Sequence, residues 1–381
     1  MKIGLVCPYN MFRPGGVQEC IRAHKAELQK RGHEVKIISP RPKKEGVNND
    51  PDLILVSDSI EVNTPFDTLV DVSLRVDTDE LDEMLLREQF DILHFHEPWV
   101  PRMPMMLLER SPAVNVATFH AKLPESMFNK SIEVAISPYT KQVFKSLDYL
   151  TAVSEAAASY VSSLTNGTDI EIVPNGIDLA MYNPAKVKKA KEYDDDTKTI
   201  LYIGRLEKRK GTIWLLKAYR ELVKKHGNIR LLIASDGHKR QMLEEFVEDN
   251  NLPNVEFLGF ISDERKLELL KTADLFCSPA LYGESFGIVL IEAMAMGTVT
   301  VCGNNIGYSS VMKGEGDISL VDPKDTVTFA HRLEHLLYDE KVRASWQKWA
   351  KRYVQQFNYP VVVDRYEEIY NELLQDRQKN T

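Results

Sequence analysis

The sequence predicts an α/β fold of two Rossmann-like domains, each with a doubly wound parallel sheet whose carboxyl edge faces a central crevice. Short, continuous apolar segments alternate with segments whose apolar residues recur at helical spacing, which is typical of parallel strands joined by crossover helices. The chain has 381 residues, too many for one ordinary domain and enough for two with separate cores. In such folds ligands bind where the strands end.

In the first half, strands are expected where apolar residues follow one another without polar alternation, as in strands buried on both faces. Helices are expected at 17–31, which Gly32 ends, and at 154–164. The expected strands are 2–7, 34–39, 91–95, 114–119, 148–153 and 170–173.

The same alternation restarts after a charged segment at 186–198. We therefore expect an N-terminal domain over 1–173 and a C-terminal domain over 174–359. In the second half, strands are expected at 199–203, 229–234, 255–258, 274–278 and 298–302, and helices at 211–226, 239–250, 263–272 and 286–296.

Composition excludes several classes of protein. The net charge of −8 argues against a protein that mainly binds nucleic acid. The four cysteines show neither CxxC pairs nor the spacing of metal ligands, which fits a reducing compartment. The first residues lack the apolar core of a signal peptide, and no apolar run reaches the length of a membrane span. A cytoplasmic protein is expected, with peripheral attachment at the inner face of the cell membrane left open.

Two loops have the composition of phosphate-binding sites. Gly15 and Gly16 allow close approach of the backbone to a ligand, and the helix after them offers N–H groups to an anion, although such a pair equally fits a plain turn. The segment GRLEKRKG at 204–211 places Arg205 and Lys210 between a strand and a helix. That position favours diphosphate binding over a solvated run of charge.

The segment GESFGIVLIEAMAMG at 283–297 carries two carboxylates, and the residues between them are apolar or small. Glu284 and Glu292 stand eight residues apart, about 12 Å along a helix, which matches the reach from the sugar to the ribose of a nucleotide sugar. The N–H groups of Phe286 and Gly287 would then face the diphosphate. Spacing alone slightly favours ordinary helical glutamates.

Histidines end two predicted strands. His94 and His96 form an HxH pair that is weak evidence for a metal site without a third ligand. His120 ends the strand at 114–119, where it is a candidate for a hydrogen bond to substrate. Asn175, in PNGID at 174–178, is first a turn residue.

Together these segments resemble the retaining glycosyltransferases of family 4, which have the two-domain GT-B fold. Within that family the chain is most similar to the phosphatidylinositol mannosyltransferases of actinobacteria. The likeness spans nearly the whole chain. Its segments are MKIGLVCPYNMFRPGGVQ at 1–18, GHEV at 32–35, FDILHFHEP at 90–98, ATFH at 117–120, PNGID, GRLEKRKG, ADLFCSP at 273–279 and ESFGIVLIEAMAMGT at 284–298.

The resemblance implies transfer of a hexose, mannose from GDP-mannose, to a hydroxyl of a lipid-linked acceptor such as phosphatidylinositol. The N-terminal domain would bind the acceptor, the C-terminal domain would bind the donor, and a last helix at 360–381 would pack back on the N-terminal domain. No metal or other cofactor is obligatory for this chemistry, and the sequence has no DxD motif in the expected donor position; stimulation by Mg²⁺ is left open.

The resemblance also assigns roles to single residues. Catalytic roles fall on His120, Arg205, Lys210 and Glu284. Asp263 and Lys266 would contact guanine, and Glu292 would hold the ribose. The other donor-binding residues would be Gly15, Gly16, Ser285, Phe286, Gly287 and Ile288, and the acceptor-binding residues would be Tyr9 and Gln18.

Two departures from the family pattern keep other functions open. The charged residues of segment 70–90 are mostly acidic, so a helix there would be repelled by an anionic membrane. Segment 57–70 matches the inositol-facing loop poorly. The alternatives are a UDP-sugar donor with another lipid or a soluble acceptor, a non-catalytic sugar-binding protein and a nucleotide-sugar epimerase. The oligomeric state is left open.

Overall fold

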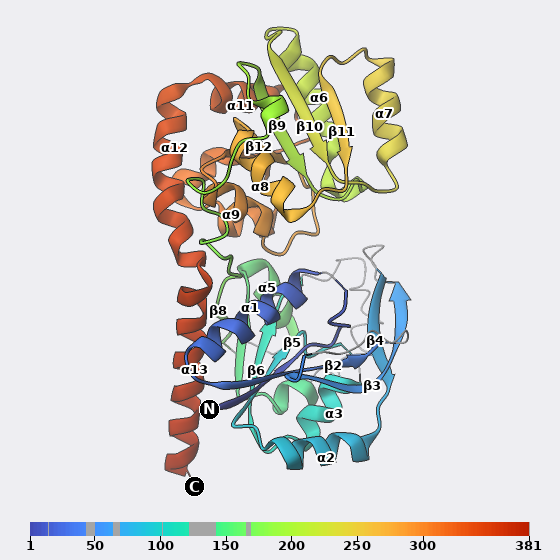
Figure 1. The fold of residues 1–381 in the computed structure, drawn as a ribbon, viewed down its shortest axis with the longest axis vertical. Helices are drawn as coiled ribbons and strands as arrows, with labels where there is room; N and C mark the ends of the chain where they lie inside the picture. The colour runs from blue at the N-terminus through green and yellow to red at the C-terminus, as the bar shows by residue number, and fades with distance from the viewer. Residues whose placement is uncertain are drawn as a thin grey trace. The chain divides into compact units, whose positions relative to one another are not determined.

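The protein divides into two compact units (Figure 1). The computed structural model describes residues 1–13, 15–42, 50–63, 69–100, 102–121, 142–164 and 169–380. One unit is Met1–Gly176 with Tyr359–Thr381, and the other is Ile177–Asn358. The boundaries expected from the sequence, at 173/174 and 359/360, lie three residues and one residue from these.

The described part of the N-terminal unit forms an eight-stranded sheet in the order β4-β3-β2-β1-β5-β6-β7-β8. Neighbouring strands are parallel except for β3 and β4, which are antiparallel. The strands are β1 (Lys2–Val6), β2 (Glu34–Arg41), β3 (Leu53–Asn63), β4 (Leu69–Arg75), β5 (Ile92–His96), β6 (Val114–Phe119), β7 (Tyr149–Ala152) and β8 (Glu171–Ile172).

Strands β3 and β4 were missed by the sequence analysis. Along β3 the polar side chains of Ser57 and Ser59 are buried, whereas the apolar Ile60 is exposed. The apolar run of β3 is confined to residues 53–56, which pair with β2. The later residues pair with the antiparallel edge strand β4 and lack the apolar continuity of the central strands, because such a pair needs apolar residues on one face only.

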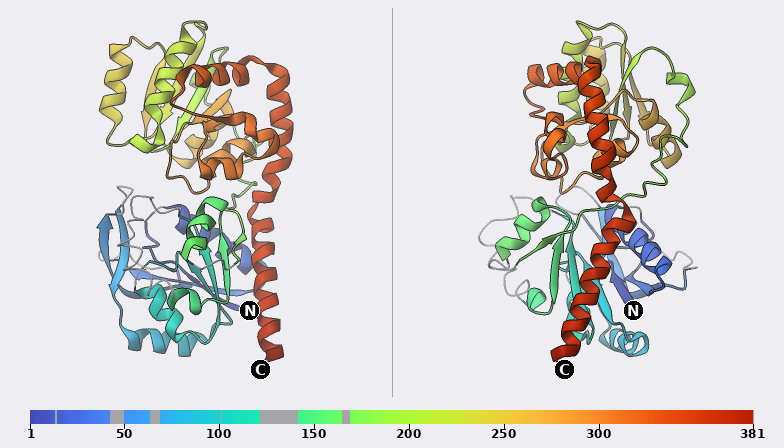
Figure 2. Two further views of the ribbon diagram at one scale, coloured as in Figure 1. Left: turned by 180° about the vertical axis from the view of Figure 1, so that it is seen from behind. Right: turned by 90° about the vertical axis from the view of Figure 1, so that its left-hand side faces the viewer.

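Helices pack on both faces of the N-terminal sheet (Figures 1 and 2). They are α1 (Gly16–Lys30), α2 (Thr78–Glu88), α3 (Met103–Arg110), α5 (Glu155–Leu164) and α13 (Tyr359–Asn380). The C-terminal helix α13 belongs to this unit although it is far away in the sequence. Its residues Val363, Ile369 and Tyr370 are fully buried in one core cluster with Ile3 of β1 and Ile21 of α1.

The C-terminal unit has a six-stranded sheet in the order β11-β10-β9-β12-β13-β14, parallel throughout. The strands are β9 (Lys198–Ile203), β10 (Ile229–Ala234), β11 (Val255–Gly259), β12 (Leu275–Ser278), β13 (Val299–Gly303) and β14 (Leu320–Val321). The helices are α6 (Thr212–Val223), α7 (Arg240–Asp249), α8 (Asp263–Thr272), α9 (Ile288–Ala295), α10 (Ile306–Val311), α11 (Thr326–Tyr338) and α12 (Glu340–Tyr353).

The expected fold class of two α/β units with parallel sheets is confirmed. The helix expected at 286–296 begins at Ile288, because Gly287 has φ of 111° and stands outside the helix. None of the helices in the described part of the chain combines the length and apolar character that crossing a membrane requires.

The strand orders show where ligands would bind in each unit. Each sheet reverses its order beside its first strand: β1 lies between β2 and β5, and β9 lies between β10 and β12. In open parallel sheets, ligands bind at the carboxyl ends of the strands at such a switch point. In the C-terminal unit the loops there are 204–211 after β9 and 279–287 after β12.

Candidate active site

The cationic loop after β9 is held at the carboxyl edge of the sheet by backbone hydrogen bonds. The Leu206 N–H donates to the Asp236 carbonyl over 3.0 Å, and the Lys239 N–H donates to the Leu206 carbonyl over 3.0 Å. A 3-10 turn at Lys208–Lys210 follows and ends at Gly211, whose φ is 73°. A Cβ at Gly211 would overlap the carbonyl oxygen of Pro279, so this glycine lets the loop after β12 approach the loop after β9.

Lys210 and Glu284, predicted from separate segments, are in direct contact. Glu284 Oε1 lies 2.8 Å from Lys210 Nζ and 2.7 Å from Arg209 Nη1. All three side chains are largely buried. The two loops of the switch point therefore join one carboxylate to two cations.

Arg205 is connected to this group through a carboxylate that the sequence analysis did not assign. Glu207 Oε1 lies 2.9 Å from Arg205 Nη1, and its Oε2 lies 2.9 Å from Arg209 Nε. Arg209 thus bridges Glu207 and Glu284. In the sequence, only the position of Arg209 within the cationic run indicated a role for it. No sequence pattern predicted a role for Glu207.

The segment after Glu284 leads into the start of α9. Phe286 is buried, and its ring packs edge-on against Phe357 with 5.8 Å between centroids. Only its backbone is therefore suited to meet a ligand. Gly287 is the N-cap residue of α9 and has no side chain that could accept a hydrogen bond from the helix. The first N–H groups of α9, beginning at Ile288, therefore have no side-chain cap. Ser285 lies between Glu284 and Phe286 in the loop that leads to α9.

Gly307 of α10 supports the Glu284 loop from behind, and its replacement gives a steric test. A Cβ there would overlap the carbonyl oxygen of Glu284. Gly307→Ala is expected to weaken nucleotide-sugar binding about tenfold or more, because displacing Glu284 would remove a hydrogen bond from its carboxylate to the ligand, and a bond to a charged group is worth about 1.5–3 kcal/mol. Binding is measured by calorimetry, with Gly227→Ala as control because a Cβ at Gly227 meets nothing within 4 Å. Equal binding by both variants would contradict the assignment.

The residues predicted for guanine and ribose also meet. Lys266 Nζ lies 2.9 Å from Glu292 Oε1 and 3.4 Å from Asp263 Oδ1. Burial is the largest single influence and acts to lower the pKa of Lys266, but the charges and hydrogen bonds of Glu292 and Asp263 together outweigh it, so the pKa is raised. The Tyr182 hydroxyl also donates to Glu292 Oε1. Tyr182 was missed, because no charged or glycine-rich pattern surrounds it.

The glycine loop of the N-terminal unit begins α1. Gly15 precedes the helix and Gly16 is its first residue. A Cβ at Gly15 would overlap Gln18 Oε1, and Gln18 Nε2 donates to the Asn10 carbonyl over 3.3 Å. Burial, followed by the charge of Glu97, raises the pKa of Tyr9 well above its ordinary value. Gln18 and the loop that carries Tyr9 are therefore joined.

His120 belongs to a buried cluster of histidines in the N-terminal unit. Its Nε2 lies 2.8 Å from His96 Nδ1, and the His96 ring stacks on His94 at 4.5 Å between centroids. His24 of α1 lies 5.9 Å from His96 by ring centroids. Burial lowers the pKa of all four, to about 4 for His24 and about 3 for His120.

The protonation of His94 follows from its neighbours. The Thr151 hydroxyl donates its one proton to the Ala117 carbonyl, so it can only accept from the Thr118 hydroxyl. The Thr118 hydroxyl has then used its own proton and must accept from its other partners, which include His94. His94 Nε2 must therefore carry the proton given to Thr118 Oγ1 over 2.7 Å. Its Nδ1 accepts from the Tyr370 hydroxyl of α13 over 2.6 Å. Both nitrogens of this neutral histidine are used within the core.

Glu97 holds the backbone at His120. Its Oε1 accepts from the backbone N–H groups of His120 and Ala121. Burial raises the pKa of Glu97 to about 8. Among the described residues, no group of three or more His, Cys, Asp or Glu side chains is placed to hold a metal ion.

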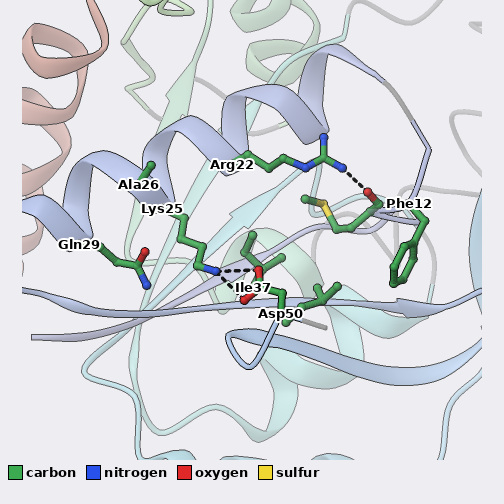
Figure 3. Close-up of a pocket in the computed structure, with 9 residues that line it drawn as sticks. Phe12, Arg22, Lys25, Ala26, Gln29, Ile37 and Asp50 are labelled. Carbon is green, nitrogen blue, oxygen red and sulfur yellow. Dashed lines mark hydrogen bonds and ion pairs between the residues drawn. The ribbon is translucent and has the colours of Figure 1, made fainter. Parts of the chain in front are cut away.

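A cavity of about 400 Å³ lies beside α1 (Figure 3). It contains none of the predicted site residues, and its cations are already paired: Lys25 lies 2.7 Å from Asp50, and Arg22, which donates to the Met11 carbonyl, lies 2.6 Å from Glu19. It therefore lacks the uncompensated positive charge that a diphosphate requires. Its lining is Met11, Phe12, Arg22, Lys25, Ala26, Gln29, Ile37, Asp50 and Leu53.

The chain matches two family models, one in each half. Residues 14–181 match the model described as Glycosyltransferase Family 4, and residues 185–353 match the model described as Glycosyl transferases group 1. A phosphatidyl-myo-inositol mannosyltransferase of Mycolicibacterium smegmatis is 31% identical over 375 residues, which cover 97% of this chain and 93% of that protein.

Solved structures show the same fold. A glycosyltransferase from Rickettsia africae matches with a TM-score of 0.75 and 20% identity over 98% of both chains. The Anabaena protein HepE in complex with UDP and glucose matches with a TM-score of 0.74 and 16% identity, over 98% of this chain and all of that one. At these identities the likeness concerns the fold, which is GT-B.

Proposed function

Because the chain belongs to glycosyltransferase family 4, we propose that it transfers mannose from GDP-mannose, with retention, to a hydroxyl of a lipid-linked acceptor such as phosphatidylinositol. The observation that carries this proposal is the meeting of Arg209, Lys210 and Glu284 at the switch point of the C-terminal sheet. A mannosyltransferase similar to the chain over almost its full length supports the sugar and the acceptor class.

In this proposal the C-terminal unit stabilises the leaving group. As the bond to the sugar breaks, negative charge grows on the nucleoside diphosphate. Arg205 and Lys210 offset that charge, together with the N–H groups at the start of α9, and such preorganised electrostatics is commonly the largest catalytic contribution. Glu284 accepts from the sugar hydroxyls, Glu292 accepts from the ribose, and Asp263 and Lys266 face the base. The cations already present can do this without a metal ion, and Mg²⁺ would add only stimulation.

The N-terminal unit supplies the acceptor side of the proposal. Tyr9 and Gln18 would bind the acceptor, the backbone of Gly15 and Gly16 would meet the donor diphosphate, and His120 would face the transferred sugar. The protein would act in the cytoplasm, peripherally at the inner face of the cell membrane. The α2 surface would not make that contact, since Asp79 and Glu80 open a helix whose charge anionic lipid repels.

Nucleotide binding tests the donor. At about 100 times its dissociation constant, GDP is expected to stabilise the protein by about 2.7 kcal/mol and raise the melting temperature by about 5–10 °C. UDP at the same concentration is the matched control, because it differs in the base alone. A shift with UDP and none with GDP would establish the alternative of a UDP-sugar donor. No shift with either would remove the donor assignment.

Product analysis tests the reaction. Mass spectrometry after incubation with GDP-mannose and either phosphatidylinositol or a lipid extract should show one added hexose per acceptor. Formation of an epimerised nucleotide sugar without an acceptor would instead indicate an epimerase. Tight sugar binding with no product under any condition would indicate a binding protein.

A further inference from the structure

Tyr182 has no role in the proposed reaction as described above, but it contacts Glu292, a residue of the proposed donor site. Its hydroxyl donates to Glu292 Oε1, the same oxygen that Lys266 Nζ approaches at 2.9 Å. Tyr182 and Glu292 are both buried, and the Lys266 ammonium lies 5.4 Å from the centre of the tyrosine ring. A tyrosine, a lysine and a carboxylate from three separate segments thus form one cluster.

A short turn holds Tyr182 in place. The N–H groups of Met181 and Tyr182 donate to the Asp178 carbonyl over 3.0 and 3.1 Å, and the Asp178 side chain accepts from the Ala180 N–H over 2.8 Å. The turn is tied to the end of the unit, because the Ile177 N–H donates to the Phe357 carbonyl over 2.7 Å. The tyrosine hydroxyl is therefore presented on a braced backbone.

The two donors leave the second carboxylate oxygen of Glu292 out of their bonds. A carboxylate only accepts hydrogen bonds, and both the phenol and the ammonium act on Oε1. Such charge-assisted bonds are strong in a buried setting, so they restrict how the carboxylate can turn. Oε2 is then oriented in advance to accept from a hydroxyl group of a ligand, which lowers the entropy lost on binding.

We propose that Tyr182 is a positioning residue that orients Glu292 toward a ribose hydroxyl and so sets the preference of this site for ribonucleotides over deoxyribonucleotides. The inference rests on the proposed function, in which Glu292 holds the ribose of the donor. It adds that the selectivity comes from the pair of Tyr182 and Glu292. A glutamate held by Lys266 alone keeps its charge but loses one of two restraints.

The variant Tyr182→Phe removes the hydroxyl and keeps the ring beside Lys266. Calorimetry with the full-length protein gives the dissociation constants of GDP, 2′-deoxy-GDP and 3′-deoxy-GDP. The wild type is expected to bind GDP about tenfold or more tightly than the analogue that lacks the bound hydroxyl. In Tyr182→Phe, GDP is expected to weaken by about 5- to 10-fold while that analogue changes less than about twofold. The ratio of the two dissociation constants should therefore approach one.

Tyr193→Phe is the matched control, because the Tyr193 hydroxyl also bonds a glutamate, Glu256, and the variant keeps the ring that lies against Arg265 of α8. It should keep the wild-type ratio. Equal weakening of GDP and both analogues in Tyr182→Phe would mean a merely structural role and overturn the inference, as would a wild type that does not discriminate among them. If the wild type binds UDP instead of GDP, the same comparison with UDP and its deoxy analogues decides. Failure of the assignment of a nucleotide-sugar donor site is distinct: the wild type would bind neither nucleotide.

Discussion

Replacing Lys210 by alanine is expected to lower the rate of sugar transfer by about 100- to 1,000-fold, the usual loss when one preorganised donor to a developing anion is removed. Lys210 is largely buried beside Glu284, so its charge acts with little screening by solvent. Its removal also takes away one of the two cations bound to Glu284 Oε1. The measurement is the initial rate with GDP-mannose and acceptor, at saturating and at limiting donor.

Lys225→Ala is the matched control for this variant. Lys225 also pairs with a glutamate, Glu334, at 3.0 Å, but its side chain is more than half exposed and follows the end of α6 that is farther from the cationic loop. This variant should transfer sugar at the wild-type rate. If Lys210→Ala kept that rate as well, the electrostatic role assigned to the loop after β9 would be wrong.

Acidification is expected to destabilise the N-terminal unit steeply below about pH 6.5. The four buried histidines have lowered pKa values in the folded state, so the unfolded chain binds up to four more protons there and stability falls as the pH falls. Glu97, with a pKa of about 8 in the folded state, acts in the opposite sense. Its contribution to stability is fully present below about pH 4.5 and is lost as the pH rises toward 8. The net uptake of about three protons corresponds to about 4 kcal/mol per pH unit between pH 6 and 5.

Thermal unfolding followed by circular dichroism between pH 5 and 8 measures this slope. His24→Leu should reduce the proton uptake by about one, because it removes one buried imidazole that lies outside the predicted site. The exposed His331 provides the control, and His331→Gln should leave the slope unchanged. A wild-type stability that is flat between pH 6.5 and 5 would show that the cluster already binds protons in the folded state.

Much of the fold could be predicted, because parallel strands buried on both faces have a local signature. β1, β6 and β10 are mostly apolar without strict alternation, and the structure places them almost where the sequence predicted them. The antiparallel pair β3 and β4 escaped because its pattern follows the environment of an edge, with buried serines and an exposed isoleucine. Which face of an edge strand is buried depends on the folded sheet and cannot be predicted from the short segment alone.

The candidate site shows the same division. The chemistry of Lys210, Glu284 and Glu292 was readable from their segments, because cations between a strand and a helix and carboxylates near the two ends of an apolar segment are local patterns. Their contacts were not. Glu284 meets Lys210 because β12 lies beside β9 although β10 and β11 intervene in the sequence.

The sequence by itself therefore determined the two α/β units, the phosphate-binding composition of two loops and the family resemblance. Only the tertiary structure decided that Glu207 joins Arg205 to Arg209, that Glu97 holds the backbone of His120, and that Tyr182 reaches Glu292 across 110 residues. The physical reason is that strand order brings distant loops to one edge of a sheet. A side chain's partner depends on that order, whereas its chemical type does not.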